Sequence, residues 1–114
     1  MNLAKIALLQ VATTAEEDIS FRINRVLKDL ETALQNQVKL AILPELWASG
    51  AFSVSETKHL AKEITDAALP QIKDLAKKYK TWIHTGSFLE NTVAGIFNTS
   101  FLFDDRGEQV AKYR

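Results

Sequence analysis

The chain has no cysteine, only four glycines and two prolines, and no net charge. Without cysteine, these 114 residues cannot supply a disulfide, a thiolate metal ligand or a cysteine nucleophile. The 14 acidic and 14 basic residues balance, so no excess of positive charge favours nucleic acid or anionic lipid. No apolar run has the length of a membrane span, and Ile6–Leu9 is too short for a signal peptide. We therefore expect a cytoplasmic protein with no nucleic-acid or membrane partner and no cofactor or metal.

The residues that are present have the composition of one folded domain. Hydrophobic residues make up 46% of the chain and charged residues 25%, which is typical of a globular protein and not of a disordered one. A chain of 114 residues forms one domain at most. The residues that carry the function are therefore sought within a single domain.

The stretch around Pro44 is the most informative part of the sequence. The unbroken apolar run Leu40–Leu43 predicts a strand buried on both faces, and Pro44 ends it by removing a backbone donor. Glu45 follows at the carboxyl end of this strand, which is the edge where α/β sheets bind ligands. Between Leu43 and Leu46 its carboxylate is expected to be partly removed from water, which suits a general base. A solvated loop residue or a helix-capping residue is the alternative interpretation.

The first half of the chain has the pattern of a βαβ unit. An apolar segment at 3–11 predicts the first strand, and apolar residues recur at helical spacing over 15–36. Thr14 and Glu17 match a capping box at the start of this helix. With the strand at 39–43, the order predicts two parallel strands joined by a right-handed crossover.

The middle of the chain predicts a loop and two further helices. The loop at 47–53 carries aromatic residues and could line a pocket or cover the core. A short helix is expected over 55–64, where His59 has no acid or cysteine at ligand spacing and is interpreted as a surface histidine. A second helix is expected over 69–80, with Pro70 tolerated in its first turn.

Three further strands are predicted at 81–88, 96–103 and 108–114. Asp104–Gly107 between the last two is typical of a hairpin turn, because glycine accepts the positive φ that such turns require. His84 within the first of these strands is interpreted as a hydrogen-bonded core histidine. We expect a mixed sheet with 3–11, 39–43 and 81–88 at its centre.

Several short motifs follow one another along the chain, and their order carries more information than any one of them. They are Ile6–Gln10, Leu43–Leu46 with Gly50 after it, Gly86–Ser87, Phe97–Ser100, Asp104–Gly107 and Tyr113–Arg114. This ordered set resembles the N-terminal part of the nitrilase superfamily, the carbon–nitrogen hydrolases, over nearly the whole chain. Ala51 departs from the pattern, since many members carry an aromatic residue there, and this puts the shape of the pocket in doubt.

The resemblance implies an α-β-β-α sandwich and a Glu-Lys-Cys amidase acting on non-peptide carbon–nitrogen bonds of small amides. Glu45 takes the position of the family's base, which activates the cysteine and later the hydrolytic water. The family's lysine directly follows the residues that match Tyr113–Arg114, and its cysteine lies further on. Residues 1–114 are thus expected to be a partial domain, truncated before the catalytic lysine and cysteine and inactive alone. Lys112 is a poor substitute, because a strand places it on the opposite face.

Two other interpretations remain beside that of a hydrolase segment. One is a non-catalytic half-domain that pairs with another chain, and the other is a structural domain that shares only the fold. Helices 15–36 and 69–80 are expected on one face of the sheet, which leaves apolar surface exposed on the other and predicts a homo-oligomer. In the complete protein, Leu46, Trp47 and Phe52 are expected to shield Glu45 from water.

Overall fold

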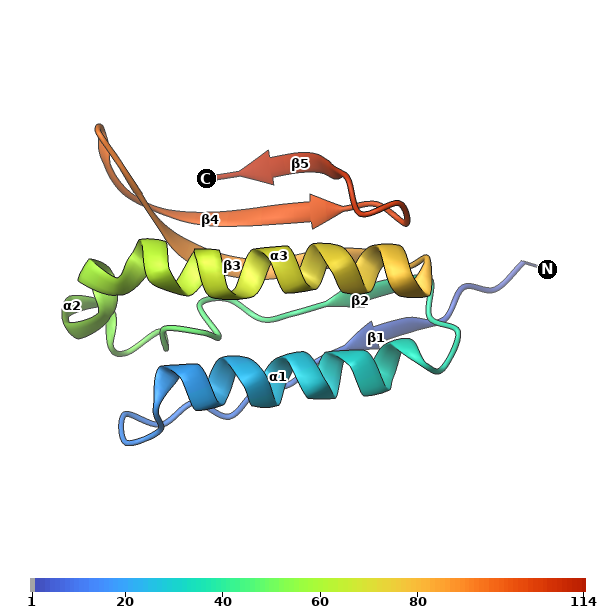
Figure 1. Ribbon diagram of the computed structural model, residues 1–114, viewed down its shortest axis with the longest axis horizontal. Helices are drawn as coiled ribbons and strands as arrows, with labels where there is room; N and C mark the ends of the chain where they lie inside the picture. Colours follow the sequence, from blue (N-terminus) through green and yellow to red (C-terminus); the bar gives the residue numbers. More distant parts are fainter. Residues whose placement is uncertain (1) are drawn as a thin grey trace.

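The computed structural model describes residues 2–114 and contains five strands, two long helices and two short helical turns (Figure 1). In chain order these are β1 (Ile6–Leu8), α1 (Ile19–Leu34), β2 (Leu40–Ile42), α2 (Val54–Thr57), the 3-10 turn η1 (Lys58–Leu60), α3 (Ala61–Tyr79), β3 (Trp82–Thr92), β4 (Gly95–Phe103) and β5 (Gln109–Tyr113). The mixed α/β class expected from the sequence is confirmed.

The strands form one sheet in the order β1-β2-β3-β4-β5, so the expectation that 3–11 lies at the centre is wrong and β1 is an edge strand among residues 2–114. The first three are parallel, as the βαβ pattern predicts, and β4 and β5 continue the sheet in antiparallel hairpins. Ala41 pairs with Ile83, which pairs with Phe103, and all three side chains are buried. The neighbouring row contains Leu8 and His84, whose side chains lie on the other face because side-chain direction alternates along a strand.

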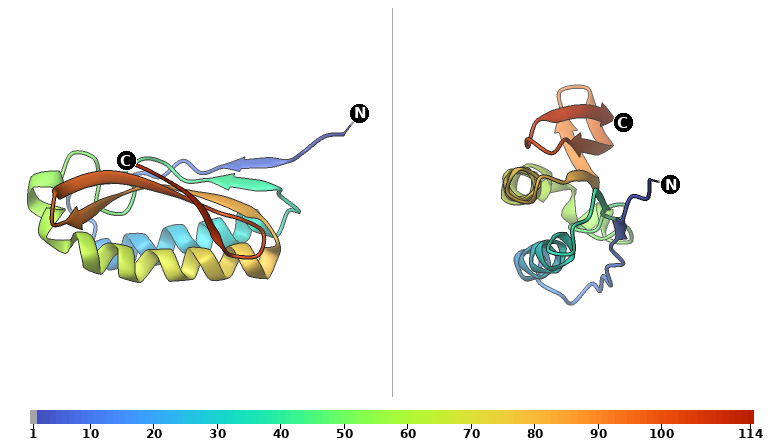
Figure 2. Two further views of the ribbon diagram at one scale, coloured as in Figure 1. Left: turned by 90° about the horizontal axis from the view of Figure 1, so that it is seen from above. Right: turned by 90° about the vertical axis from the view of Figure 1, so that its right-hand side faces the viewer.

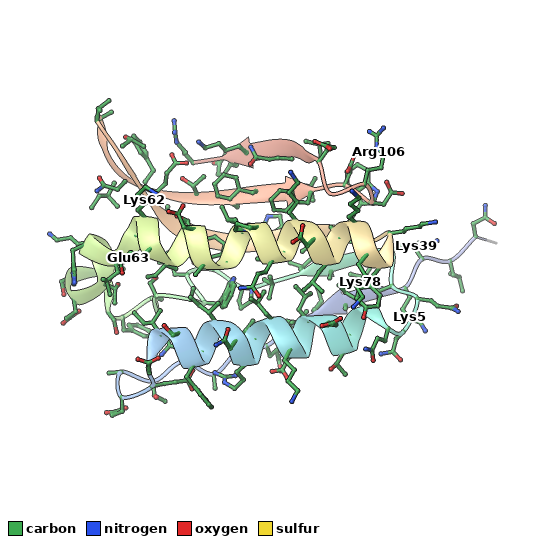
Figure 3. All side chains as sticks on the ribbon, in the orientation of Figure 1. Lys5, Lys39, Lys62, Glu63, Lys78 and Arg106 are labelled. Atoms are coloured by element: carbon green, nitrogen blue, oxygen red, sulfur yellow. The ribbon has the colours of Figure 1, made fainter. Side chains whose placement is uncertain are left out.

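Both long helices cover the same face of the sheet, as the two views of Figure 2 show. The core lies between them and the strands, and its largest fully buried side chains include Leu30 of α1 and Ile72 of α3. Lys78 of α3 reaches α1 and pairs with Glu31 at 2.8 Å (Figure 3). We call the other side of the sheet the open face. It is formed by Ile6, Leu8, Leu40, Ile42, Trp82, His84, Ser100, Leu102, Ala111 and Tyr113.

The prediction of two separate helices at 55–64 and 69–80 is wrong. Ala61–Tyr79 is a single 19-residue helix, and Pro70 lies inside it and not in a first turn. A proline inside a helix costs about 3 kcal/mol, through a missing hydrogen bond and a steric clash. The apolar stripe nevertheless continues through Ala68 and Ile72, both fully buried, so packing against the sheet outweighs that cost.

The start of α1 also differs from the prediction. Asp18 is the N-cap, and its carboxylate accepts a hydrogen bond from the Phe21 amide at 3.0 Å. The capping box of Thr14 and Glu17 is wrong, and the helix begins at Ile19, later than expected. Glu17 instead forms ion pairs with two arginines of α1. Its carboxylate therefore binds side chains and does not cap the backbone amides at the helix start.

Strand lengths differ from the sequence pattern at both ends of the sheet. β1 has only three residues where nine were expected, because its partner β2 is itself cut short before Pro44. β3 extends to Thr92, beyond the predicted end at 88, because it pairs with β4 up to Thr92 and Gly95. The two strands of this long hairpin are joined by a tight turn between Thr92 and Gly95.

Candidate active site

Glu45 lies just past the carboxyl end of β2, where the backbone on each side of it is attached to β3. The Leu43 amide donates to the His84 carbonyl at 3.0 Å, which extends the β2–β3 ladder by one bond. Beyond Glu45, the Leu46 amide donates to the Ser87 carbonyl at 3.0 Å and to its hydroxyl at 3.1 Å. The position of the Glu45 backbone is therefore set by the sheet and not by a free loop.

Gly86 permits this attachment, because no other residue fits between β3 and the chain at Pro44. The register of β3 shifts between His84 and Ser87, and Gly86 there has a φ of 68°. A Cβ atom at Gly86 would lie 2.0 Å from the Pro44 carbonyl oxygen. This close approach of the two backbones holds the loop of Glu45 against β3.

The side chain of Glu45 points into an open cavity of about 250 Å³ on the open face. Its Oε1 accepts a hydrogen bond from the Asn98 Nδ2 of β4 at 2.7 Å. Eight residues line the cavity, namely Leu43, Glu45, His84, Gly86, Ser87, Asn98, Ser100 and Tyr113. They come from the loop after β2 and from β3, β4 and β5, so the site is assembled by strand pairing.

Glu45 is exposed in this chain, so the expected removal of its carboxylate from water between Leu43 and Leu46 is wrong here, whereas shielding by Leu46, Trp47 and Phe52 in the complete protein stays a prediction. Leu46 has a left-handed backbone with a φ of 48°, which turns the chain toward the core directly after Glu45. Trp47 is therefore buried, packed edge-on against Phe88 at 5.6 Å, and Phe52 projects fully into solvent. None of the three side chains covers the carboxylate.

The loop after Glu45 is also fixed from the helix side, by Arg22. This side chain is buried, and its guanidinium donates to the Ala48 carbonyl at 3.1 Å and to the Thr14 carbonyl at 2.6 Å. It also pairs with Glu17 at 3.0 Å. The hydrogen bond from Arg25, together with that from Arg22, lowers the pKa of Glu17. The sequence pattern placed Arg22 away from the apolar stripe and gave no sign of this role.

The end of β5 lies at the same end of the sheet as Glu45. Because β5 is antiparallel to β4 and β4 to β3, β5 runs in the direction of β2 and β3. Tyr113 lines the Glu45 cavity, whereas Lys112 lies on the other face and pairs with Glu90 at 2.6 Å. The prediction that Lys112 is on the wrong face to serve the site is confirmed.

Of the eight residues that line the cavity, only Glu45 was assigned to a site from the sequence. Asn98 and Tyr113 belong to consecutive hairpins that lie far from Glu45 in the sequence, so their register on the open face was needed to place them beside it. His84 was interpreted as a core histidine, but it is half-buried on the open face. Its Nδ1 accepts a hydrogen bond from the Gly86 amide at 3.2 Å, so the hydrogen bond expected of it is present.

A larger cavity of about 370 Å³ lies between α1 and α3 on the helix face. Its charged groups include Glu31 and Lys78, which are paired with each other. Within residues 2–114, no three histidine, aspartate or glutamate side chains converge as metal ligands. Nor does that part of the chain contain a helix long and apolar enough to cross a membrane.

Two curated proteins with similar sequences are amidases. The 2-oxoglutaramate amidase of Paenarthrobacter nicotinovorans is 31% identical over 113 residues, covering 96% of this chain and 38% of that protein. The deaminated glutathione amidase of Dictyostelium discoideum is 31% identical over 120 residues, covering 98% of this chain and 40% of that protein. The chain thus spans about two fifths of the length of these curated relatives.

Solved structures share the fold. The carbon-nitrogen hydrolase from Helicobacter pylori G27 superposes with a TM-score of 0.80 at 21% identity, covering 97% of this chain and 39% of that one. The carbon-nitrogen hydrolase family itself matches residues 5–114. The chain therefore belongs to the carbon–nitrogen hydrolase family of the nitrilase superfamily, and its α/β unit corresponds to the N-terminal part of that fold.

Proposed function

We propose that this chain provides the general base of an amidase that hydrolyses non-peptide carbon–nitrogen bonds of small amides, and that Glu45 is that base. The observation that carries the proposal is the position of Glu45 at the carboxyl edge of the parallel strands, in an open cavity with its backbone hydrogen-bonded to β3. A general base must be held within hydrogen-bond reach of the proton it removes, and this attachment supports that requirement.

The contact with Asn98 supports a division of work between the two oxygens of Glu45. Oε1 accepts a hydrogen bond from the Asn98 amide, which restricts the rotation of the carboxylate, and in the proposed reaction Oε2 takes the proton. In the proposed reaction Glu45 takes the proton of a thiol as the thiolate attacks the amide carbon. It then gives this proton to the departing amine and later activates the water that releases the acid.

The nucleophile of this reaction has to come from outside residues 1–114, which contain no cysteine. By resemblance the family's lysine directly follows Arg114. Side chains alternate along β5, so the residue after Arg114 falls on the face of Tyr113, the face that holds Glu45. We therefore propose that residues 1–114 form the Glu45 side of a shared site and hydrolyse no amide by themselves.

The test is Glu45→Gln in the protein that carries the downstream lysine and cysteine. We expect it to fold normally and to lose about a hundredfold to ten-thousandfold in the rate of acyl-enzyme formation. Glu63→Gln, at an exposed glutamate on α3, is the matched control and should keep the wild-type rate. Acylation at the wild-type rate in Glu45→Gln would refute the role of Glu45. Turnover by residues 1–114 alone, abolished by the same substitution, would refute the shared site.

The open face supports a second candidate function, that of a half-domain that pairs with another chain. Leu8 is 72% exposed and Trp82 is 41% exposed on this face, although both are large and apolar. In the complete protein we propose that a second sheet covers it, and for residues 1–114 alone we propose self-association. Sedimentation velocity over a range of concentrations tests this, and a monomer at the highest concentration would contradict it.

A further inference from the structure

Glu90 of β3 is bound on the helix face of the sheet by two cations, Lys112 of β5 and Arg114 directly after this strand. Its Oε2 pairs with the Lys112 Nζ at 2.6 Å, and its Oε1 accepts a hydrogen bond from the Arg114 Nε at 2.8 Å. Each carboxylate oxygen therefore has its own cation. Removal of the Glu90 charge would release both side chains at once.

These ion pairs cross a strand, because β3 and β5 are not neighbours and β4 lies between them. Two phenylalanines of β4 lie beneath the cations. Lys112 lies 5.7 Å from the ring centre of Phe101, and the Arg114 guanidinium lies 4.9 Å from that of Phe97. Rings at these distances attract cations and keep the ion pairs partly out of water. The cluster thus joins three strands by side chains as well as by the backbone ladder.

Among residues 2–114, few other contacts hold the end of β5 in place. All five residues of β5 are exposed, and among residues 2–114 this strand pairs only with β4. Ser100 and Tyr113 form the last backbone pair, and Arg114 lies beyond it. The ends of exposed edge strands open readily unless side chains hold them.

The charge of Glu90 is retained at neutral pH. Burial raises the pKa of this carboxyl, since its side chain is only 18% exposed, but the bonds from Lys112 and Arg114 outweigh burial and lower the pKa overall. Both cations therefore face an ionised carboxylate under ordinary conditions.

We propose that Glu90 is a positioning residue for the Glu45 site, a role that rests on the proposed function. By holding Lys112 and Arg114 on the helix face, Glu90 keeps the alternate residues of β5 on the open face. Tyr113 is one of these, and it lines the cavity of Glu45. The residue that follows Arg114 is the next, so Glu90 sets the position at which the family's lysine would meet the substrate.

The test compares Glu90→Gln with wild type in the full-length protein. Hydrogen–deuterium exchange should become at least about tenfold faster in a peptide covering 109–114 and stay unchanged over α1. With rates normalised to titrated active sites, kcat should fall about tenfold and KM should change less than twofold, because the substrate still binds but meets a displaced group. Glu31→Gln is the matched control. It also removes a carboxylate bound to a lysine, but between the helices, and it should leave both readouts unchanged.

Unchanged exchange over 109–114 in Glu90→Gln would overturn the proposal, and so would faster exchange with an unchanged kcat. If Glu90→Gln does not fold, Glu90→Asp keeps the charge, shortens the reach, and should show the same changes to a smaller degree. The exchange measurement does not depend on catalysis. A failure of Glu45→Gln to lower the rate would therefore refute the proposed function. The exchange result would still show whether Glu90 holds β5 in place.

Discussion

The two faces of the sheet are built from the same strands but differ in what they do. On the helix face, Ala41, Ile83 and Phe103 form a row that is buried beneath the helices. On the open face, the neighbouring row contains Leu8, which is 72% exposed. A one-residue step along any strand thus separates a side chain that stabilises the fold from one that is free to contact another surface.

The candidate site belongs to the open face, yet it is held in place from the helix face. Glu45 projects into the cavity on the open side, while Trp47 and Arg22 fix the following loop among the core residues and the helix. The close approach of Gly86 to Pro44 joins the two sides at this point, together with the hydrogen bonds from the Leu43 and Leu46 amides to β3. The comparison teaches that substitutions on the helix face should affect stability first, and those on the open face should affect association or chemistry.

Gly86→Ala should break the connection between the two faces and have one of the largest effects on stability. Its Cβ would lie 2.0 Å from the Pro44 oxygen, and the backbone there has a φ of 68°. We expect a loss of about 2–5 kcal/mol in the free energy of unfolding, measured by urea denaturation.

Gly95→Ala is the matched control for this prediction. Gly95 also has a positive φ, of 129°, but a Cβ there meets no atom within 4 Å. It therefore shares the backbone strain and lacks the clash, and it should cost clearly less. Equal losses at the two glycines would mean that the contact with Pro44 does not anchor the loop.

A pair of leucines tests the difference between the faces directly. Leu30 of α1 is fully buried on the helix face, and Leu30→Ala should cost about 2–5 kcal/mol of unfolding free energy. Leu8→Ala on the open face should change stability by less than about 1 kcal/mol, because its side chain is already in water. Thermal and urea unfolding of both variants would decide this, and similar losses would contradict the division between the faces.

Much of the fold could be predicted because local patterns determine it. The apolar run before Pro44 identified β2 and placed Glu45 at its carboxyl end, and alternation along β5 put Lys112 on the wrong face to serve Glu45. Each of these needed only the period of a strand and the properties of one residue. The family resemblance then gave Glu45 a role that position alone could not give.

The misplaced features depend on contacts between distant residues. Pro70 indicated a helix start because the lack of a backbone amide is a property of the residue itself. The packing that continues α3 past Pro70 is made with the sheet, which is distant in the sequence. Glu45 looked shielded because Leu46 and Trp47 are its neighbours, but the left-handed turn at Leu46 directs both into the core. Asn98 became part of the site only when β4 was paired with β3.

Low pH should have a smaller effect on stability. It acts through carboxylates whose pKa is lowered by their hydrogen-bond partners. Asp104 is one, because the backbone amides of Glu108 and Arg106 donate to it at 2.9 Å and 3.0 Å and lower its pKa. Glu31 is another, since the hydrogen bonds of Lys78 and Tyr79 lower its pKa. A carboxyl with a depressed folded pKa stabilises fully above its unfolded value, about 3.9 for Asp and 4.3 for Glu, and loses this as the pH falls.

We therefore expect the urea midpoint to be level near neutral pH and to fall below about pH 4.3, as protons bind first to the unfolded chain. Asp104→Asn removes one such group and keeps an oxygen that can accept the same amides, so its midpoint should decline less steeply below pH 4. Glu63→Gln, at an exposed glutamate of α3, should leave the slope as it is in the wild type. The contrast matters because Asp104 turns the chain from β4 into β5, the strand that brings Tyr113 to the Glu45 cavity. An acid slope unaffected by Asp104→Asn would mean that this turn is held by its backbone bonds alone, and that the carboxylate adds nothing to the placement of β5.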